Sequence, residues 1–189
     1  MVSLNTPLCN FGWKAKSFNL LGVDDKSWTL DKAKGKNGLL IMFICNHCPY
    51  VKAILPRLIN DLSELNQFGI KSIAISSNDV ENYPDDSFEK MKNLSISNNF
   101  SFPYVFDDSQ SVAKSYNAIC TPDFFGFNKN LELQYRGRFD STGRETKPPI
   151  INQRDLYEAM KMISITQKGP KTQFSSIGCS LKWKEVKQN

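Results

Sequence analysis

Two cysteines separated by two residues, in Cys45-Asn46-His47-Cys48, are the residues of this chain whose types and spacing predict chemistry. They directly follow the apolar run 39–44 and precede Pro49, which suits a first helical turn because no amide hydrogen is needed there. Two thiols at this spacing can close a disulfide across the first turn of a helix, where the peptide amides favour a thiolate. The motif therefore predicts thiol redox chemistry.

Each residue of the motif has an expected role. We expect Cys45 to be the nucleophile, with a lowered pKa, and Cys48 to resolve the mixed disulfide. His47 is the only histidine of the sequence. An imidazolium there would stabilise the thiolate and make the disulfide more oxidising. Asn46 and His47 are therefore assigned to tuning the cysteine pKa.

A metal site and a pair of inert buried thiols are the competing interpretations of the motif. Structural zinc normally has four Cys or His ligands in two spaced pairs. The other cysteines, Cys9, Cys120 and Cys179, are single and scattered, and there is no second histidine. We therefore expect no metal ion and no other cofactor, and we interpret Cys9 as incidental.

The composition limits the class of protein. The 189 residues, of which 40% are hydrophobic, suit one well-buried core. Because periodicity ends near Gly169-Pro170, we expect one domain over residues 1–165 and a C-terminal tail over 166–189 that carries Cys179. The net charge of +5 is mild, so we expect no nucleic-acid partner.

Hydropathy also predicts where the protein works. No stretch reaches the roughly 18 consecutive apolar residues of a membrane-spanning helix. The opening residues lack a basic start followed by an apolar run, which would indicate export. We therefore expect a protein of the reducing cytoplasm with no membrane partner.

Hydrophobic periodicity predicts a β-α-β unit around the motif. Residues 38–44 are typical of a central strand that is buried on both faces, and the strand places Cys45 at its carboxyl end. Apolar residues at helical spacing predict a helix over 51–65, kinked at Pro56 and ended by Gly69. The next strand is predicted over 70–76, after a right-handed crossover.

The flanking segments predict the remaining elements of an α/β domain. An antiparallel hairpin is predicted before the unit, and helices alternate with short strands after it. In order, these are a hairpin over 18–30, a helix over 85–98, a strand over 103–106, a helix over 109–116, a hairpin over 124–135 and a helix over 155–165.

A β-α-β unit with a strand-end CxxC, followed by a Thr-Pro step, a hairpin and a closing helix, resembles the thioredoxin superfamily over about residues 15–165. The N-terminal hairpin, the helix over 85–98 and the run 120–125 (Cys-Thr-Pro-Asp-Phe-Phe) are similar to its AhpC/TSA-type, peroxiredoxin-like branch. The resemblance implies a three-layer α/β fold, in which helices flank a central mixed β-sheet that an N-terminal β-hairpin extends.

The resemblance also implies roles for residues that face the motif. Thr121-Pro122 would form a cis peptide bond opposite the two cysteines. The Thr121 backbone would then be free to pair with an incoming peptide or disulfide partner. Cys120 and Cys179 are possible additional redox thiols. Cys120 lies two residues before Pro122, and the tail that carries Cys179 could dock back on the domain.

Some positions depart from the patterns of the related families. Asn46-His47 stands where thioredoxin has Gly-Pro. Leu39 stands where thioredoxins have a buried carboxylate, which leaves proton transfer at Cys48 without an assigned residue. Met42 stands where peroxiredoxins have a Thr or Ser, and this argues against a peroxidase.

We therefore predict a thiol-disulfide oxidoreductase that exchanges disulfides with a protein or low-molecular-weight thiol partner and is reduced by a thioredoxin or glutathione system. The first alternative is an antioxidant peroxidase, in which a peroxide converts Cys45 to a sulfenic acid and Cys48 condenses with it. The second alternative is a non-enzymatic copper chaperone that holds Cu(I) through both cysteines. Such chaperones add a distant histidine, which this sequence lacks.

Overall fold

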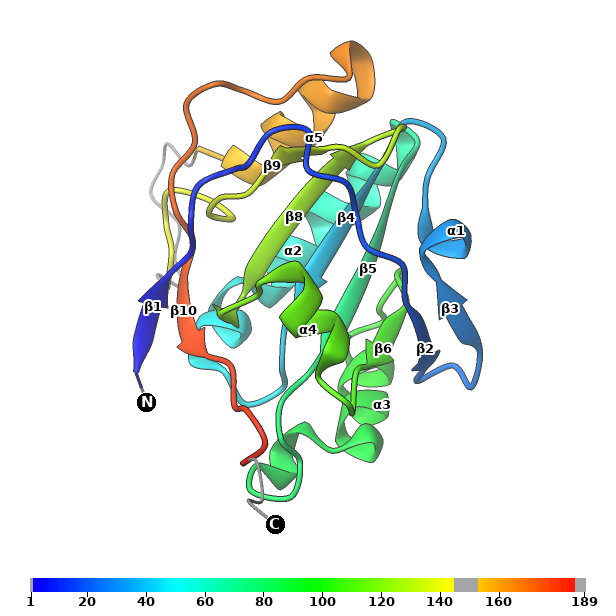
Figure 1. Cartoon of the computed structure of the whole chain (residues 1–189), viewed down its shortest axis with the longest axis vertical. Coiled ribbons are helices and arrows are strands. Elements are labelled where there is room, and N and C mark those ends of the chain that lie inside the picture. The colour runs from blue at the N-terminus through cyan, green and yellow to red at the C-terminus, as the bar shows by residue number, and fades with distance from the viewer. Residues whose placement is uncertain (1, 145–152, 186–189) are drawn as a thin grey trace.

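A seven-stranded mixed sheet forms the centre of the molecule, as the computed structural model in Figure 1 shows. The structure describes residues 2–144 and 153–185. The strand order is β3-β2-β6-β5-β4-β8-β9. The strands are β2 (Asn19–Gly22), β3 (Ser27–Thr29), β4 (Gly38–Phe43), β5 (Ile70–Ser76), β6 (Tyr104–Phe106), β8 (Asp123–Asn128) and β9 (Leu133–Tyr135). The predicted central sheet and its N-terminal hairpin are therefore confirmed.

Strand β4 lies inside the sheet, and all of its residues are buried. It pairs in parallel with β5, from Gly38 opposite Ile70 to Phe43 opposite Ile75, and antiparallel with β8. Because both faces of the strand are covered, its sequence is apolar without alternation. The strand ends at Phe43, so Cys45 lies just beyond the carboxyl end of β4.

Helices cover both faces of the sheet (Figure 1). On one face, α2 (Pro49–Gln67), α3 (Phe88–Ser97) and α5 (Asp155–Thr166) contribute to a core that contains Leu40 and Met42. On the other face, α1 (Leu30–Ala33) and α4 (Ser111–Tyr116) contribute to a core that contains Leu39 and Ile41. The three layers implied by the resemblance are thus confirmed. In the described residues, no helix is both long and apolar enough to span a lipid bilayer.

The ends of α2 explain why the helix begins directly after the CxxC motif. Cys48 is its N-cap residue and Pro49 occupies its first position. Gly69 follows its C-terminal end with a φ of +73°, a left-handed conformation that favours glycine. Pro56 lies inside the helix, and the kink expected there stays a prediction.

A second, antiparallel sheet of three strands joins the two ends of the chain, in the order β1-β10-β7. Its strands are β1 (Ser3–Asn5), β7 (Cys120–Thr121) and β10 (Ile177–Ser180). The sequence did not predict them, because each is too short to show a periodic pattern. The segment expected as a tail therefore contributes a strand. Residues 186–189 lie outside the described part of that segment, and the domain boundary at residue 165 stays a prediction.

Candidate active site

Cys45 and Cys48 lie together where β4 ends and α2 begins. Both are buried free thiols. Cys45 Sγ lies 3.3 Å from Thr121 Oγ1, and Cys48 Sγ lies 3.1 Å from the Thr121 carbonyl oxygen, to which its thiol donates. The Thr121-Pro122 peptide bond is cis. The structure therefore brings the CxxC motif face to face with residues 120–122, the cis-proline loop, as the resemblance implied.

A buried carboxylate, Asp86, holds the CxxC motif in place. Its Oδ1 accepts hydrogen bonds from the backbone N–H groups of Asn46, at 2.8 Å, and His47, at 3.2 Å. Its Oδ2 lies 2.6 Å from His47 Nδ1 and accepts a hydrogen bond from the Asn78 amide at 2.7 Å. Asp86 is the last residue of the 3-10 helix η1 (Pro84–Asp86). Sequence reasoning missed it, because it lies 39 positions from His47 in an ordinary Pro-Asp-Asp turn.

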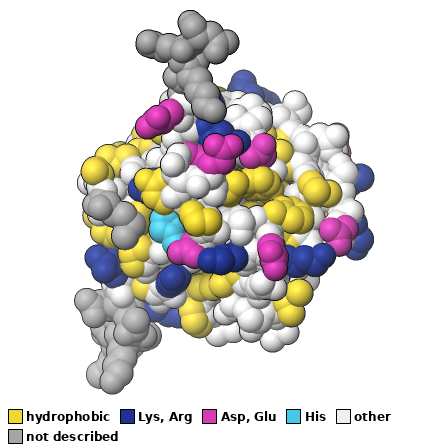
Figure 2. All heavy atoms as spheres, turned by 90° about the horizontal axis from the view of Figure 1, so that it is seen from below, with side chains coloured by type: hydrophobic (Ala, Val, Ile, Leu, Met, Phe, Trp, Pro, Cys, Tyr) yellow, Lys and Arg dark blue, Asp and Glu magenta, His cyan; other side chains and the backbone are white. Residues whose placement is uncertain are grey.

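His47 is held between this carboxylate and an aromatic ring. Its imidazole stacks on Tyr83, with ring centroids 5.6 Å apart and planes 12° apart. His47 Nδ1 lies 4.0 Å from Cys45 Sγ, and the His47 side chain is 16% exposed. Figure 2 shows this single histidine at the surface, among hydrophobic, basic and acidic side chains. The imidazole therefore links the buried thiol of Cys45 to the solvent.

Asn46 fixes the loop that carries the thiols. Its side-chain amide donates to the Asp85 carbonyl at 2.9 Å, and its Oδ1 accepts a hydrogen bond from the Tyr104 hydroxyl at 3.0 Å. Burial raises the pKa of Tyr104 well above its ordinary value, so this hydroxyl keeps its proton. Tyr104 was also missed from the sequence. Its contact makes Asn46 a positioning residue for the loop, and any influence of Asn46 on the thiols is exerted through that loop.

The two thiols of the motif shift in opposite directions because they share a hydrogen bond. The pKa of Cys48 is lowered to about 5, first by the hydrogen bond from Cys45 and then by those from Thr121 and the Val51 backbone N–H, while burial opposes the shift. The pKa of Cys45 is raised well above its ordinary value by the same hydrogen bond, by burial and by the charge of Asp86. The expected low pKa at Cys45 is therefore wrong for the reduced pair, because the hydrogen bond with Cys48 and burial, and after them the charge of Asp86, favour the protonated thiol.

Two more cysteines lie beside the motif. Cys179 in β10 lies opposite Thr121, the residue whose carbonyl oxygen is 3.1 Å from Cys48 Sγ, and it helps to lower the pKa of Cys48. Cys120 in β7 donates to the Pro122 carbonyl, at an Sγ–O distance of 3.6 Å. Burial raises the pKa of Cys120, so its thiol stays protonated. Cys9 is only half-buried and packs against the core on the other face of the sheet.

Strand β10 covers the cis-proline loop. Cys179 lies opposite Thr121 in the antiparallel pairing of β10 with β7, and the Ser176 hydroxyl donates to the Pro122 carbonyl at 3.0 Å. A Cβ at Gly178 would lie 2.2 Å from the Thr121 carbonyl oxygen, so this close approach requires glycine. The Thr121 backbone is therefore not free to pair with an incoming peptide, which corrects the expectation drawn from the resemblance.

Cys45, His47 and Asp86 are the candidate metal ligands of the described residues, since one ligand atom of each lies within 4.8 Å of the others. Both oxygens of Asp86 already accept hydrogen bonds from the motif and from Asn78. Binding an ion through Asp86 would break some of these contacts and leave buried donors unpaired. The arrangement therefore fits a thiol centre better than a metal centre.

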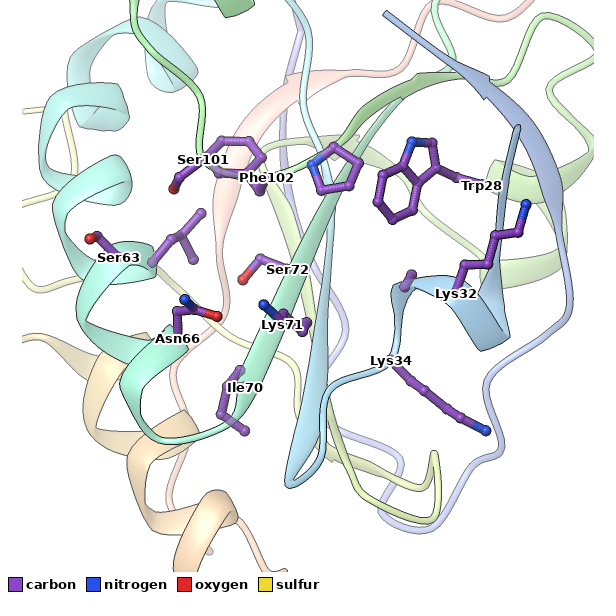
Figure 3. Close-up of a pocket in the computed structure, with 13 residues that line it drawn as sticks. Trp28, Lys32, Lys34, Ser63, Asn66, Ile70, Lys71, Ser72, Ser101 and Phe102 are labelled. Carbon is purple, nitrogen blue, oxygen red and sulfur yellow. The ribbon is translucent and has the colours of Figure 1, made fainter. Parts of the chain in front are cut away.

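A separate pocket lies at the opposite end of the sheet (Figure 3). Residues 70–72, at the start of β5, form part of its wall, whereas the thiols lie beyond the carboxyl ends of the strands. Trp28 and Phe102 supply aromatic surface. The residues that line this pocket include no cysteine, so we assign it no part in the thiol chemistry.

Comparisons with known proteins agree with this geometry. Residues 11–136 match the AhpC/TSA family. An uncharacterized conserved protein from Geobacillus kaustophilus is 36% identical with a TM-score of 0.92, and the alignment covers 98% of each chain. A hypothetical protein from Sinorhizobium meliloti is 33% identical with a TM-score of 0.88, over 96% of this chain and 100% of the other. No curated protein matches this chain.

A more distant similarity concerns the fold alone. The thioredoxin domain of a thiol-disulfide oxidoreductase from Bacteroides vulgatus is 19% identical with a TM-score of 0.56, over 67% of this chain and 86% of the other. It shares the arrangement of sheet and helices described above. With the family match covering most of the chain, and with a thioredoxin-like fold around a CxxC motif, this protein belongs to the AhpC/TSA family.

Proposed function

We propose that this protein is a thiol-disulfide oxidoreductase that uses Cys45 and Cys48. The observation that carries the proposal is a pair of buried thiols at the start of a helix, each in contact with Thr121 of the cis-proline loop, with the pKa of Cys48 lowered to about 5. A thiol with such a pKa is mostly thiolate at neutral pH. Its neighbour lies close enough for the pair to form and resolve a mixed disulfide.

The shared hydrogen bond lets the negative charge move to the sulfur that attacks. When the proton passes from Cys45 to Cys48, the Cys48 thiol donates to the Thr121 carbonyl and Cys45 becomes a thiolate beside His47. Cys45 then attacks a substrate disulfide, forms a mixed disulfide and releases one substrate thiolate. Cys48 gives up its proton and attacks Cys45, which closes the Cys45–Cys48 disulfide and releases the second substrate thiol.

Because β10 pairs with the cis-proline loop, it limits which partners can bind there. A polypeptide that pairs with the Thr121 backbone must first displace β10. A low-molecular-weight disulfide does not need to pair with the Thr121 backbone, and the partly exposed His47 lies 4.0 Å from Cys45 Sγ. The site therefore favours a small disulfide over an extended peptide. We further propose that a thioredoxin or glutathione system restores the dithiol, and that the protein works in the cytoplasm, where thiols are kept reduced.

A thiol-dependent peroxidase is a second candidate function, and the AhpC/TSA match over residues 11–136 favours it. Cys45 would take one oxygen from a peroxide to become a sulfenic acid, and condensation with Cys48 would release water and close the disulfide. Met42 offers no hydroxyl where peroxiredoxins have a Thr or Ser. The Thr121 hydroxyl, 3.3 Å from Cys45 Sγ, is the group that could orient a peroxide here.

Parallel rate measurements test the proposal. The reduced protein is mixed with equal concentrations of oxidised glutathione, insulin or hydrogen peroxide, quenched with acid, alkylated and mapped by mass spectrometry, with Cys45→Ser as the control. We expect the Cys45–Cys48 disulfide to form fastest with oxidised glutathione. A faster reaction with peroxide through a Cys45 sulfenic acid would identify a peroxidase. If no oxidant reacts, the redox proposal fails, and Cu(I) binding by the two cysteines becomes the function to test.

A further inference from the structure

Strand β10 brings a third thiol into the candidate active site. Cys179 is buried opposite Thr121, whose carbonyl oxygen lies 3.1 Å from Cys48 Sγ, and Cys48 and Cys179 each shift the pKa of the other. Cys48 therefore has two thiol neighbours, Cys45 and Cys179. The mechanism proposed above uses only the first of them, which leaves Cys179 without a role.

Strand pairing on both sides fixes the position of Cys179. It lies opposite Ser3 of β1 and opposite Thr121 of β7. The Leu181 N–H donates to the Ile119 carbonyl at 3.0 Å, which holds the end of the strand. A thiol held in this way stays within reach of Cys48 without the entropic cost of ordering a loop.

We propose that Cys179 is a third redox thiol, which attacks the Cys48 sulfur of the Cys45–Cys48 disulfide. The bond between Cys45 and Cys48 breaks, a bond between Cys48 and Cys179 forms, and Cys45 leaves as a thiolate. The proton lost by Cys179 is taken up by Cys45. The step exchanges one disulfide for another within the chain, so no external oxidant or reductant is needed. The inference rests on the proposed function.

The electrostatic surroundings of Cys179 become more favourable once the pair is oxidised. In the dithiol, burial first, and then the hydrogen bond to Cys48 and its charge, raise the pKa of Cys179 to about 11, while Lys182 and Arg144 lower it. In a disulfide Cys48 carries no negative charge, so the part of the shift due to that charge is lost. Formation of the Cys45–Cys48 disulfide thereby makes Cys179 a better nucleophile.

The exchange would change which sulfur is available to a partner. In the Cys48–Cys179 form the disulfide joins the start of α2 to β10, and Cys45 is a free thiol beside the partly exposed His47. Cys45 could then attack a second substrate disulfide before a reducing partner has reduced the disulfide that the first substrate left in the chain. The protein would then have two oxidised forms, each with one disulfide. Only in the Cys48–Cys179 form is Cys45 able to react.

Cys120 is a matched control for this proposal within the same small sheet. It is buried in β7 opposite Ser180. Its thiol donates to the Pro122 carbonyl, and in the described residues no hydrogen bond joins it to Cys48. The proposal therefore predicts that Cys179, and not Cys120, links to Cys48.

The Cys45→Ser variant isolates the exchange step. Incubated with oxidised glutathione, Cys48 of this variant forms a mixed disulfide and releases one glutathione. Cys179 then attacks Cys48 and releases the second. We expect peptide mass spectrometry to find a Cys48–Cys179 disulfide. In Cys45→Ser/Cys179→Ser, release of the second glutathione should be at least about tenfold slower, whereas in Cys45→Ser/Cys120→Ser it should be unchanged.

A Cys48–Cys120 link, or a glutathione that stays on Cys48 of Cys45→Ser, would overturn the proposal. If this variant does not fold or its Cys48 stays unmodified, wild-type protein equilibrated in glutathione buffers decides the question. A Cys48–Cys179 disulfide must then accompany Cys45–Cys48, and its absence would refute the inference. A wild type that never forms Cys45–Cys48 would instead refute the proposed function, which the result with Cys45→Ser does not test.

Discussion

The two sulfurs of the CxxC motif lie in surroundings of opposite electrostatic character. Cys45 lies beside the His47 imidazole, with the Asp86 carboxylate behind it. Cys48 lies against the Thr121 carbonyl oxygen, at 3.1 Å, and beside the Thr121 side chain, the first turn of α2 and two thiols. The hydrogen bond with Cys48, burial and then the Asp86 charge raise the pKa of Cys45, whereas hydrogen bonds, first that from Cys45, lower the pKa of Cys48 to about 5. The surroundings, and not the residue type, decide which sulfur holds the charge.

This difference separates the sulfur that holds the charge from the sulfur that meets the substrate. Cys48 is fully buried against the cis-proline loop, with which β10 pairs, and has the lower pKa of the two thiols. Cys45 lies next to the partly exposed imidazole, which is the way to the solvent. One proton moving along their hydrogen bond converts the resting pair into the reactive one.

Replacing Cys45 or Cys48 with serine has the largest expected effect on the reaction. Cys45→Ser should slow turnover of oxidised glutathione by more than about a hundredfold, because it removes both the attacking sulfur and the main hydrogen bond to Cys48. Cys48→Ser should trap a mixed disulfide on Cys45, because no thiol remains beside it to resolve the intermediate. Steady-state rates and intact mass measure the two results. Absence of a mixed disulfide on Cys45 of the Cys48→Ser variant would break the distinction between the sulfurs.

The pH dependence of alkylation tests where the resting charge lies. The thiolate of Cys48 should be present above its pKa of about 5 and be lost as the pH falls through that value. Iodoacetamide should therefore label Cys48 at nearly the same rate at about pH 6 and about pH 8, whereas an ordinary thiol would be labelled about a hundredfold more slowly at the lower pH. Peptide mapping gives the rate at each cysteine. A steep rise in the rate of Cys48 labelling between these two pH values would show that Cys48 is not the thiolate of the reduced pair.

Gly178→Ala tests the contact on the Cys48 side. The new Cβ would lie 2.2 Å from the Thr121 carbonyl oxygen, so β10 must shift away from the cis-proline loop. We expect the free energy of unfolding to fall by about 1–3 kcal/mol, as for other overpacked sites, in urea titrations. Ile177→Ala, at an exposed position of the same strand, should change it by less than about 0.5 kcal/mol. Equal effects of the two changes would show that β10 does not press on the loop.

Asp86→Asn tests the Cys45 side through a single charge. The amide oxygen can still accept the backbone hydrogen bonds of the motif, but the amide NH2 would face the Asn78 amide and leave a buried donor unpaired, so the free energy of unfolding should fall by about 1–3 kcal/mol. Because the lost charge had raised it, the pKa of Cys45 should fall. Alkylation profiles measure this shift, with exposed Asp85→Asn as the control. If the pKa of Cys45 is the same in Asp86→Asn and in the wild type, the Asp86 charge does not raise it.

The chemistry of the motif could be predicted from the sequence because its determinants are local. Residues 38–49 hold a buried strand, both thiols and the start of a helix in one continuous stretch. Hydrophobic periodicity on either side predicted the β-α-β unit that positions them. The cis bond at Thr121-Pro122 came from the family resemblance and is present in the structure.

The surroundings of the thiols could not be predicted, because distant segments without a pattern supply them. Asp86 comes from a three-residue turn, and nothing in its neighbours distinguishes it from a surface carboxylate. Cys179 reaches Cys48 through a strand of four residues, whose place depends on pairing with β1 and β7. His47 alone predicted a low pKa at Cys45, whereas the hydrogen bond with Cys48 and burial raise that pKa, and the distant Asp86 adds to the shift.

The order in which the cysteines react tests the central claim most directly. Reduced wild-type protein is mixed with less than one equivalent of oxidised glutathione, quenched with acid at successive times, alkylated and mapped by mass spectrometry. The account predicts that glutathione appears first on Cys45 and that the first disulfide within the chain joins Cys45 to Cys48. Glutathione appearing first on Cys48, or a first disulfide that leaves either of these cysteines out, would contradict it.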